Sequence, residues 1–156
     1  MERLTAEAFE PFGEVIEAGS GEMFLINEGT TERHHALAAV SCAAEREPIL
    51  SIFPGQPRSL PMPIAMMERH PLGSQAFVPL QSRDWIAVVA EDDGGRPGVP
   101  RAFHVRGDQG LNYAANVWHH PLIALHERSD FLVADSRGDD ANLEEATYPE
   151  PFTLSL

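Results

Sequence analysis

The chain has 156 residues, a length that suits one domain with a single core. Hydrophobic residues make up 43% of the chain and charged residues 22%, a balance typical of globular domains that argues against intrinsic disorder. The formal net charge is -13, so the surface repels nucleic acid and anionic membranes, and all 11 basic residues are arginines, which excludes lysine Schiff-base chemistry. We therefore expect one domain over residues 1–156 whose partner is neither a nucleic acid nor a membrane.

The compartment is inferred from the single cysteine and from the N-terminus. Cys42 alone excludes an intrachain disulfide and a cysteine-rich zinc site. No apolar stretch reaches the roughly 18 residues that span a bilayer, and the N-terminus lacks the basic and apolar regions of a signal peptide. We expect a cytoplasmic protein.

The first predicted element is a short helix over residues 5–10, where Thr5 supplies a cap and Pro11 a stop. From residue 23 onward, short apolar bursts are separated by Gly, Pro, Asn and Asp, a pattern typical of all-β proteins. Long helices have little room among 13 prolines and 12 glycines. Strands are predicted over residues 23–26, 37–43, 49–53, 64–69, 76–79, 85–90, 102–105, 122–126 and 131–134.

This pattern favours a β-sandwich or a small barrel. Segment 85–90 is apolar at every position, so we expect a second sheet or another subunit to cover both of its faces, which leaves room for a homodimer. Residues 91–98 are predicted to form a solvated loop. The acidic, proline-containing tail after Asp135 is predicted to be a surface arm.

Candidate chemistry centres on the histidines, of which the chain has seven. The sequence has no HExxH motif, no Walker A loop, no dinucleotide-binding glycine pattern and no nucleophile elbow. The zinc protease, nucleotide-binding and serine hydrolase classes therefore lose their sequence support.

The most informative pattern is Glu-x-His-x4-Gln, formed by Glu68, His70 and Gln75. Residues two apart on a strand project from the same face, so Glu68 and His70 can line one cavity, and the following turn returns Gln75 beside them. The spacing is similar to the first motif of the cupin barrels, usually His-x-His-x4-Glu. The segment ending at His119 resembles the Gly-x-x-His of the second cupin motif, so we expect His119 rather than His120 to face the cavity.

Three long runs, over residues 26–35, 68–79 and 112–122, resemble the bacterial ureidoglycolate lyase family, and the likeness extends from the first helix through Asp135. The resemblance implies a cupin-like β-barrel and a homodimer. It also implies cleavage of ureidoglycolate to glyoxylate and urea, late in allantoin breakdown. Some descriptions of the family mention nickel, which makes a divalent metal a candidate cofactor.

The residues can be matched to that reaction. Ureidoglycolate is a carbinolamide, so a base must take its hydroxyl proton and an acid must protonate the departing urea nitrogen. Glu68, His70 and His119 are the candidate catalytic residues, because a carboxylate and imidazoles in a partly dry cavity supply both roles. The same three side chains are the candidate metal ligands. Glu68 and Gln75 stand where a metal-binding cupin has a histidine and a carboxylate, which argues against tight metal binding.

The substrate carboxylate needs a cationic or amide partner. Arg33 is expected to bind it, because guanidinium groups bind carboxylates in a bidentate manner. Tyr113 and Trp118 either wall the cavity or pack in the barrel or the dimer interface. Two alternatives remain open, an amidohydrolase that releases ammonia and carbon dioxide and a non-catalytic small-molecule binding module. The amide side chains expected to help position the substrate are Asn27, Gln75 and Asn116.

Overall fold

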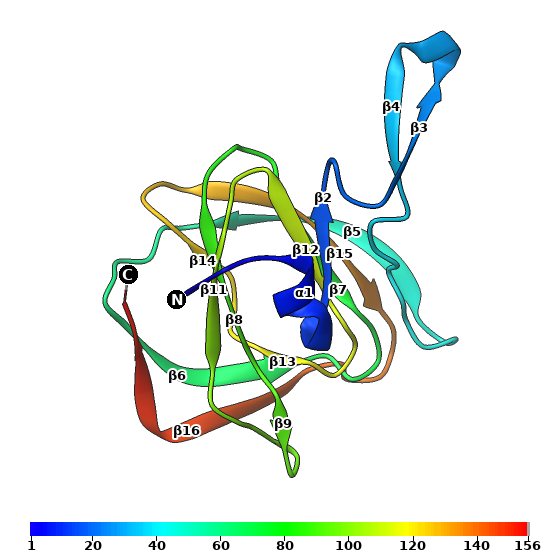
Figure 1. Ribbon diagram of the computed structural model, residues 1–156. Coiled ribbons are helices and arrows are strands. Elements are labelled where there is room, and N and C mark those ends of the chain that lie inside the picture. The colour runs from blue at the N-terminus through cyan, green and yellow to red at the C-terminus, as the bar shows by residue number, and fades with distance from the viewer. Residues whose placement is uncertain (156) are drawn as a thin grey trace.

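The computed structural model describes residues 1–155 and consists mainly of strands in two large sheets, which we call A and B (Figure 1). Sheet A contains, in spatial order, β1 (Glu2–Arg3), β11 (Arg101–Val105), β8 (Trp85–Ala90), β13 (Trp118–His119), β6 (Met62–Arg69) and β16 (Glu144–Leu154), with β14 (Ile123–Ala124) paired to β8. Sheet B contains β2 (Gly13–Glu17), β12 (Gln109–Tyr113), β7 (Gln75–Pro79), β15 (Ser129–Arg137) and β5 (Glu47–Gly55). The all-β prediction is confirmed, and the two sheets are consistent with the expected cupin-like barrel.

The predicted N-terminal helix is confirmed as α1 (Ala6–Phe9). It begins after Thr5, whose hydroxyl accepts a hydrogen bond from a first-turn amide, and it passes into the 3-10 turn η1 (Glu10–Phe12), which contains Pro11. Phe9 and Phe12 are buried, with ring centroids 6.0 Å apart. The helix therefore closes one side of the core. No helix among residues 1–155 is long and apolar enough to cross a membrane.

The main core lies between the two sheets. Odd-numbered residues of sheet B point inward, because successive side chains of a strand alternate between its faces. Sheet A contributes aromatic and branched side chains to the same cluster. The buried members include Val15, Phe77, Trp85, Val89, Phe103, Leu111, Phe131 and Val133.

Strand β8 is buried at all six positions. Trp85, Ala87 and Val89 belong to the main core, whereas the alternate residues Ile86 and Val88 belong to a second cluster that includes residues of β6, β14 and β16. The prediction that both faces are covered is confirmed. Because the covering residues belong to the same chain, β8 itself gives no support for a dimer.

Two sequence predictions are wrong. Residues 37–43 form no strand; their one isolated bridge is from Cys42 to Gly73, and separate hydrogen bonds, such as that of the Asn112 side chain to the carbonyl of Ala39, hold the segment against the body. The tail after Asp135 is not a surface arm, because β16 pairs with β6. Its prolines lie where the register of that pair shifts, and β16 is an edge strand, where a missing amide hydrogen is tolerated.

Two further predictions need smaller adjustments. Residues 91–98 include a short hairpin of β9 (Asp92–Asp93) and β10 (Arg96–Pro97) rather than only loop. Of the strand predicted over residues 122–126, only β14 forms.

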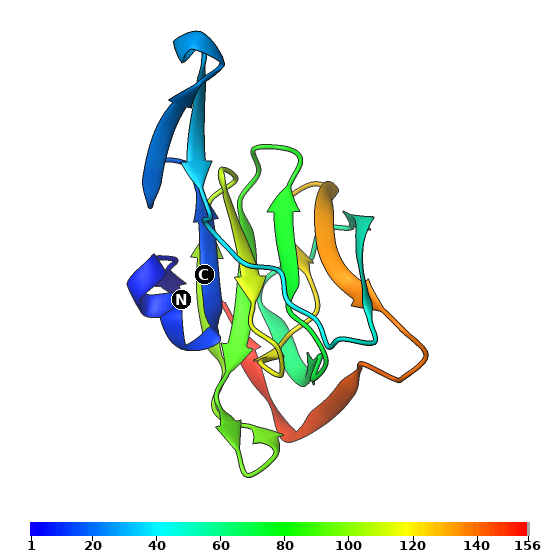
Figure 2. The same ribbon diagram turned by 90° about the vertical axis from the view of Figure 1, so that its right-hand side faces the viewer.

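A second hairpin projects from the body of the molecule (Figures 1 and 2). It consists of β3 (Glu22–Ile26) and β4 (Thr31–His35), joined by the 3-10 turn η2 (Asn27–Gly29), and we call residues 22–35 the arm. Every residue of β3 is exposed, including the consecutive apolar residues Met23 to Ile26. A two-stranded hairpin is marginally stable in water without a packing partner, so the arm needs a surface to cover it.

Sheet B carries another uncovered apolar surface, on the side away from the core. Leu50 and Ile52 are 71% and 53% exposed. Ile52 is paired with Leu132, and Leu132 with Val78, so apolar side chains form a continuous row. A continuous row differs from single exposed apolar residues, which are common on protein surfaces. We call this surface the outer face and define it by Ile16, Leu50, Ile52, Val78, Leu132 and Ala134.

Candidate active site

The structure brings Glu68, His70 and His119 together at one end of sheet A. Glu68 on β6 lies directly opposite His119 on β13, and the antiparallel pairing places Glu68 Oε1 3.6 Å from His119 Nε2. His70 follows β6, and its ring centroid is 5.3 Å from that of His119. Glu68 and His70, two residues apart, thus point to the same place, as their spacing predicted. We call these three residues the cluster.

Backbone carbonyls fix the tautomers of both histidines. His70 Nδ1 donates to the carbonyl of Asn142 at 2.6 Å, and His119 Nδ1 donates to the carbonyl of Val117 at 2.9 Å. A carbonyl only accepts hydrogen bonds, so each neutral ring carries its proton on Nδ1 and a lone pair on Nε2. Both Nε2 atoms are buried and have no hydrogen-bond partner among the described residues. Two bases therefore face the Glu68 carboxylate.

Burial sets the charge state of the cluster. It lowers the pKa of His119 to about 3, so this imidazole is neutral near pH 7. Burial also raises the pKa of Glu68, an effect that the nearby His70 partly offsets. The Tyr113 ring stacks on His119 with centroids 4.3 Å apart and planes at 12°, and burial raises the pKa of the phenol, which stays protonated. The site is thus a largely buried group of acceptors, held in place by hydrogen bonds to backbone carbonyls and by ring stacking.

The cluster also fits a divalent metal. One ligand atom from each of Glu68, His70 and His119 can be chosen so that all lie within 4.8 Å of one another. Two imidazole nitrogens and a carboxylate suit zinc, nickel, copper or iron(II), and the two unpartnered Nε2 lone pairs are of the kind that a metal satisfies.

A cavity of about 230 Å³ adjoins the cluster at His70. Gln75 lies in its wall, buried, and its amide nitrogen is 3.4 Å from a carboxylate oxygen of Asp135. The other carboxylate oxygen of Asp135 is buried without a partner. The cavity is lined by His70, Ser74, Gln75, Asp135, Ser136, Asn142 and Leu143.

Two residues at this cavity were missed by the sequence analysis. Asp135 continues the core-facing positions Phe131 and Val133 along β15, and a carboxylate at the end of such a row is a signal that could have been used. Asn142 holds His70 through its carbonyl, and its side-chain oxygen accepts a hydrogen bond from the Leu72 amide at 2.6 Å. No periodic pattern in its loop indicates this role.

Several predicted substrate-binding residues have other positions. Trp118 packs in the second core cluster, with its indole N–H on Asp92 and the Arg69 guanidinium 4.3 Å from its ring centroid, so it faces away from His119. Asn116 is exposed at a positive φ of 68°, and its backbone N–H donates to the carbonyl of His70, which places it in the turn before β13.

Arg33 and Asn27 are not brought to the cluster of their own chain. Both are exposed residues of the arm, which projects away from the body (Figure 2). Their spacing from the other motifs gave no indication that the hairpin to which they belong projects from the barrel.

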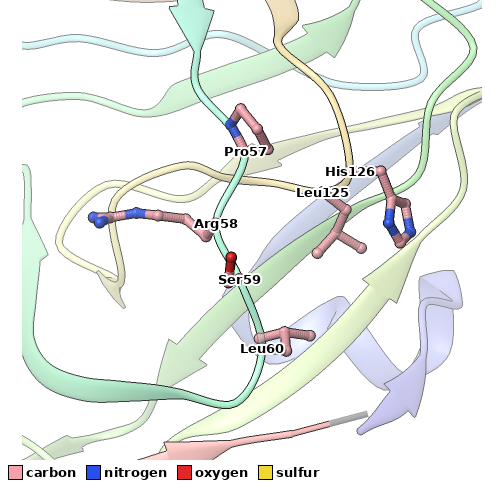
Figure 3. A pocket seen from close by; sticks show the side chains of 6 residues that line it. All are labelled: Pro57, Arg58, Ser59, Leu60, Leu125 and His126. Atoms are coloured by element: carbon pink, nitrogen blue, oxygen red, sulfur yellow. The ribbon is translucent and has the colours of Figure 1, made fainter.

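A separate hollow of about 370 Å³ lies at the other end of sheet A, beside residues 57–60 of the segment that leads into β6 (Figure 3). It contains the imidazole of His126 and no carboxylate, and Figure 3 shows the side chain of Arg58 extending away from that imidazole. This hollow therefore lacks the paired acid and base of the cluster. Its lining consists of Pro57, Arg58, Ser59, Leu60, Leu125 and His126.

Comparison with known proteins gives one consistent result. The family model described as ureidoglycolate lyase matches residues 1–155. A ureidoglycolate lyase of Rhizobium etli is 58% identical over 152 residues, covering 97% of this chain and 92% of that protein. Those of Agrobacterium fabrum and Brucella ovis are 58% and 57% identical, and the alignments cover 97% and 96% of this chain and 92% and 89% of those proteins. The chain belongs to the ureidoglycolate lyase family.

Proposed function

We propose that this chain cleaves ureidoglycolate to glyoxylate and urea by general acid–base catalysis at the cluster. The family membership and the names of the relatives support the reaction. The observation that carries the choice of site is the convergence of two buried, unpartnered imidazole Nε2 atoms on the carboxylate of Glu68. A site that only bound a ligand would not need two unpartnered bases beside a carboxylate.

The reaction breaks one C–N bond and consumes no water. The hydroxyl group gives up its proton, and its C–O bond becomes the carbonyl of glyoxylate. The electron pair of the C–N bond leaves with the ureido nitrogen, which takes up a proton and becomes urea. One group that accepts the first proton and returns it at nitrogen therefore balances the reaction.

His70 is the residue best placed to carry that proton. Its Nε2 has a free lone pair, its ring lines the cavity, and the Asn142 carbonyl holds its orientation. The neighbouring carboxylate of Glu68 stabilises the imidazolium that forms when the proton arrives. His119, neutral and rigidly stacked on Tyr113, accepts a hydrogen bond from the substrate.

Gln75 positions the substrate in the same cavity. Its buried amide nitrogen is close to the Asp135 carboxylate, and this contact limits the orientation of the amide group in the cavity wall. An amide N–H in this position can donate to a substrate oxygen without adding charge.

A divalent metal, nickel by family resemblance, is compatible with this proposal. Glu68, His70 and His119 would hold it, and when bound it would polarise a substrate oxygen as a Lewis acid. The orientation of the imidazoles by backbone carbonyls serves a metal ligand and a proton carrier equally well.

The same proposal includes the cellular setting and the assembly. The reaction belongs to allantoin breakdown in the cytoplasm, where a single cysteine, Cys42, stays reduced. A homodimer is supported by the two uncovered apolar surfaces, the outer face and the arm. A two-fold symmetric dimer can bury both surfaces of each chain at once.

Product analysis tests the reaction. Freshly prepared ureidoglycolate is incubated with the purified protein, and glyoxylate, urea and ammonia are assayed in parallel after subtraction of spontaneous decay. We expect urea and glyoxylate in equal amounts without ammonia. Ammonia in place of urea would assign an amidohydrolase, and no acceleration would assign a binding module. Parallel samples with a chelator and with added Ni²⁺ determine whether the cluster needs a metal.

A further inference from the structure

The candidate site lacks a free cation for the carboxylate of its substrate. Arg69, next to Glu68 in the chain, points to the other side of β6, where Glu144 and Asp92 pair with its guanidinium at 2.6 and 2.8 Å. Arg46 contacts Ser136 at the cavity wall, and its three donor groups are bonded to oxygens of residues 136 and 140. No arginine is among the residues that line the cavity. An anionic substrate would therefore meet Glu68 and Asp135 without compensation.

Arg33, in contrast, has a guanidinium group without a ligand. It lies exposed on β4, paired across the hairpin with Phe24, and it forms no ion pair with any described residue. Guanidinium groups bind carboxylates in a bidentate manner, so Arg33 has the chemistry that the site lacks.

The chain topology keeps Arg33 away from the site of its own chain. Tyr113, which stacks on His119, is paired with Gly13 at the start of β2. The arm follows the other end of β2, after Glu17, about 14 Å further along the sheet. From there it extends still further from the body (Figures 1 and 2). The arm thus lies at the end of sheet B opposite the end where Tyr113 contacts the cluster.

A second copy of the chain removes this separation. If two outer faces pack against each other about a two-fold axis with their strands antiparallel, the arm end of one sheet meets the cluster end of the other. The exposed apolar residues Met23 to Ile26 of the arm would then be covered by the other copy. The second copy is the favoured occupant because one symmetric contact buries both apolar surfaces of each chain.

We propose that each active site is built from two chains, with Glu68, His70 and His119 from one chain and the substrate carboxylate bound by the partner's Arg33. This inference rests on the proposed function for the identity of the substrate. Its structural part, the arm of one chain at the cluster of the other, stands independently of it. The arm is then a part of the active site rather than only a dimerisation device.

Subunit mixing tests the catalytic part. Arg33→Gln is expected to raise KM about 10- to 100-fold through loss of a charge-assisted contact, and Glu68→Gln to abolish turnover. Chains with different tags carry one substitution each, and hybrid dimers are isolated with both tags. If the site is shared, one site of each hybrid has both substitutions and the other has none, so the hybrid has half of the wild-type activity. Arg58→Gln, at an exposed arginine outside the arm, is the matched control and keeps the wild-type KM.

Three results would overturn the inference. A hybrid without any wild-type-like site would show that Arg33 acts within its own chain. An unchanged KM for Arg33→Gln would show that Arg33 binds no substrate. A monomer in sedimentation would exclude the arrangement. Failure of the proposed function is recognised separately, because wild-type protein would then release no urea.

Crosslinking tests the arrangement without reference to activity. In a Cys42→Ala background, chains with Arg33→Cys are mixed with chains with Asn116→Cys, an exposed position beside His70. A short bismaleimide is expected to join the two kinds of chain. Arg58→Cys in place of Arg33→Cys is the control and gives no such product. Absence of the mixed crosslink would contradict the shared site.

Discussion

Replacement of Asn142 by alanine tests how the contacts that orient His70 affect catalysis, without changing any of the three cluster residues. The Asn142 side-chain oxygen accepts the hydrogen bond of the part-buried Leu72 amide at 2.6 Å, and the Asn142 carbonyl accepts the Nδ1 proton of His70 at the same distance. Asn142→Ala keeps the carbonyl but removes the side chain that holds it in place. An unsatisfied, part-buried amide costs about 1–3 kcal/mol, so we expect a loss of about that size in the free energy of unfolding.

The effect on catalysis follows from the loosened ring. Removal of a group that orients an imidazole typically costs 10- to 100-fold in activity, and we expect kcat to fall by about 10-fold while KM changes little. Urea denaturation gives the stability and initial rates of urea release give kcat and KM. Asn142→Asp, which keeps an acceptor for the Leu72 amide, is the control and should recover most of the lost stability. A wild-type kcat in Asn142→Ala would refute the idea that this loop positions His70.

Two further predictions concern stability. The Glu17 carboxylate accepts a hydrogen bond from Gln109 at 2.8 Å and pairs with Arg106, and these contacts hold its pKa below the ordinary value of 4.5. The contribution of Glu17 to the free energy of unfolding is therefore complete above pH 4.5 and is lost as the pH falls through the lowered pKa. Glu17→Gln should therefore lower the free energy of unfolding at pH 7, with a difference from wild type that shrinks in acid; a constant difference in urea denaturation across this range would count against the pairing. Gly110→Ala would place a methyl group 2.6 Å from the carbonyl oxygen of Phe77 and should destabilise the protein by about 1–3 kcal/mol, whereas an unchanged denaturation midpoint would show that sheet B yields easily there.

The part of the site that the sequence predicts is the part built by strand geometry. Glu68 and His70 share a face because they are two residues apart on one strand, and His119 reaches them through a cross-strand pair. The same alternation sends Trp118 to the opposite face, where it packs in the second core cluster. Local periodicity is therefore sufficient for the cluster.

The remaining contacts depend on long-range placement, which periodicity does not encode. Asn142 reaches His70 across 72 residues of chain, from a loop without a repeating pattern. The position of Arg33 depends on a hairpin that leaves the barrel, and no spacing between motifs reveals that departure.

The errors in the fold have similar causes. Residues 37–43 are apolar enough for a strand, but their path over the body follows no sheet ladder beyond the bridge at Cys42. The tail was predicted as an arm because it is rich in Asp, Glu and Pro, but an edge strand with a register shift accommodates Pro149 and Pro151. Strand β12 was not predicted, because Gly110 and Asn112 interrupt its apolar pattern although every residue of it is buried.

The rate of urea release by His70→Gln tests the central claim most directly. The account predicts a fall in kcat of at least about 100-fold, because the group that carries the proton is lost, with an unchanged circular dichroism spectrum. His104→Gln is the matched control, since His104 pairs with Asp84 in a different part of the protein and should keep the wild-type rate. A folded His70→Gln variant that releases urea at the wild-type rate would contradict the assignment of the reaction to the cluster.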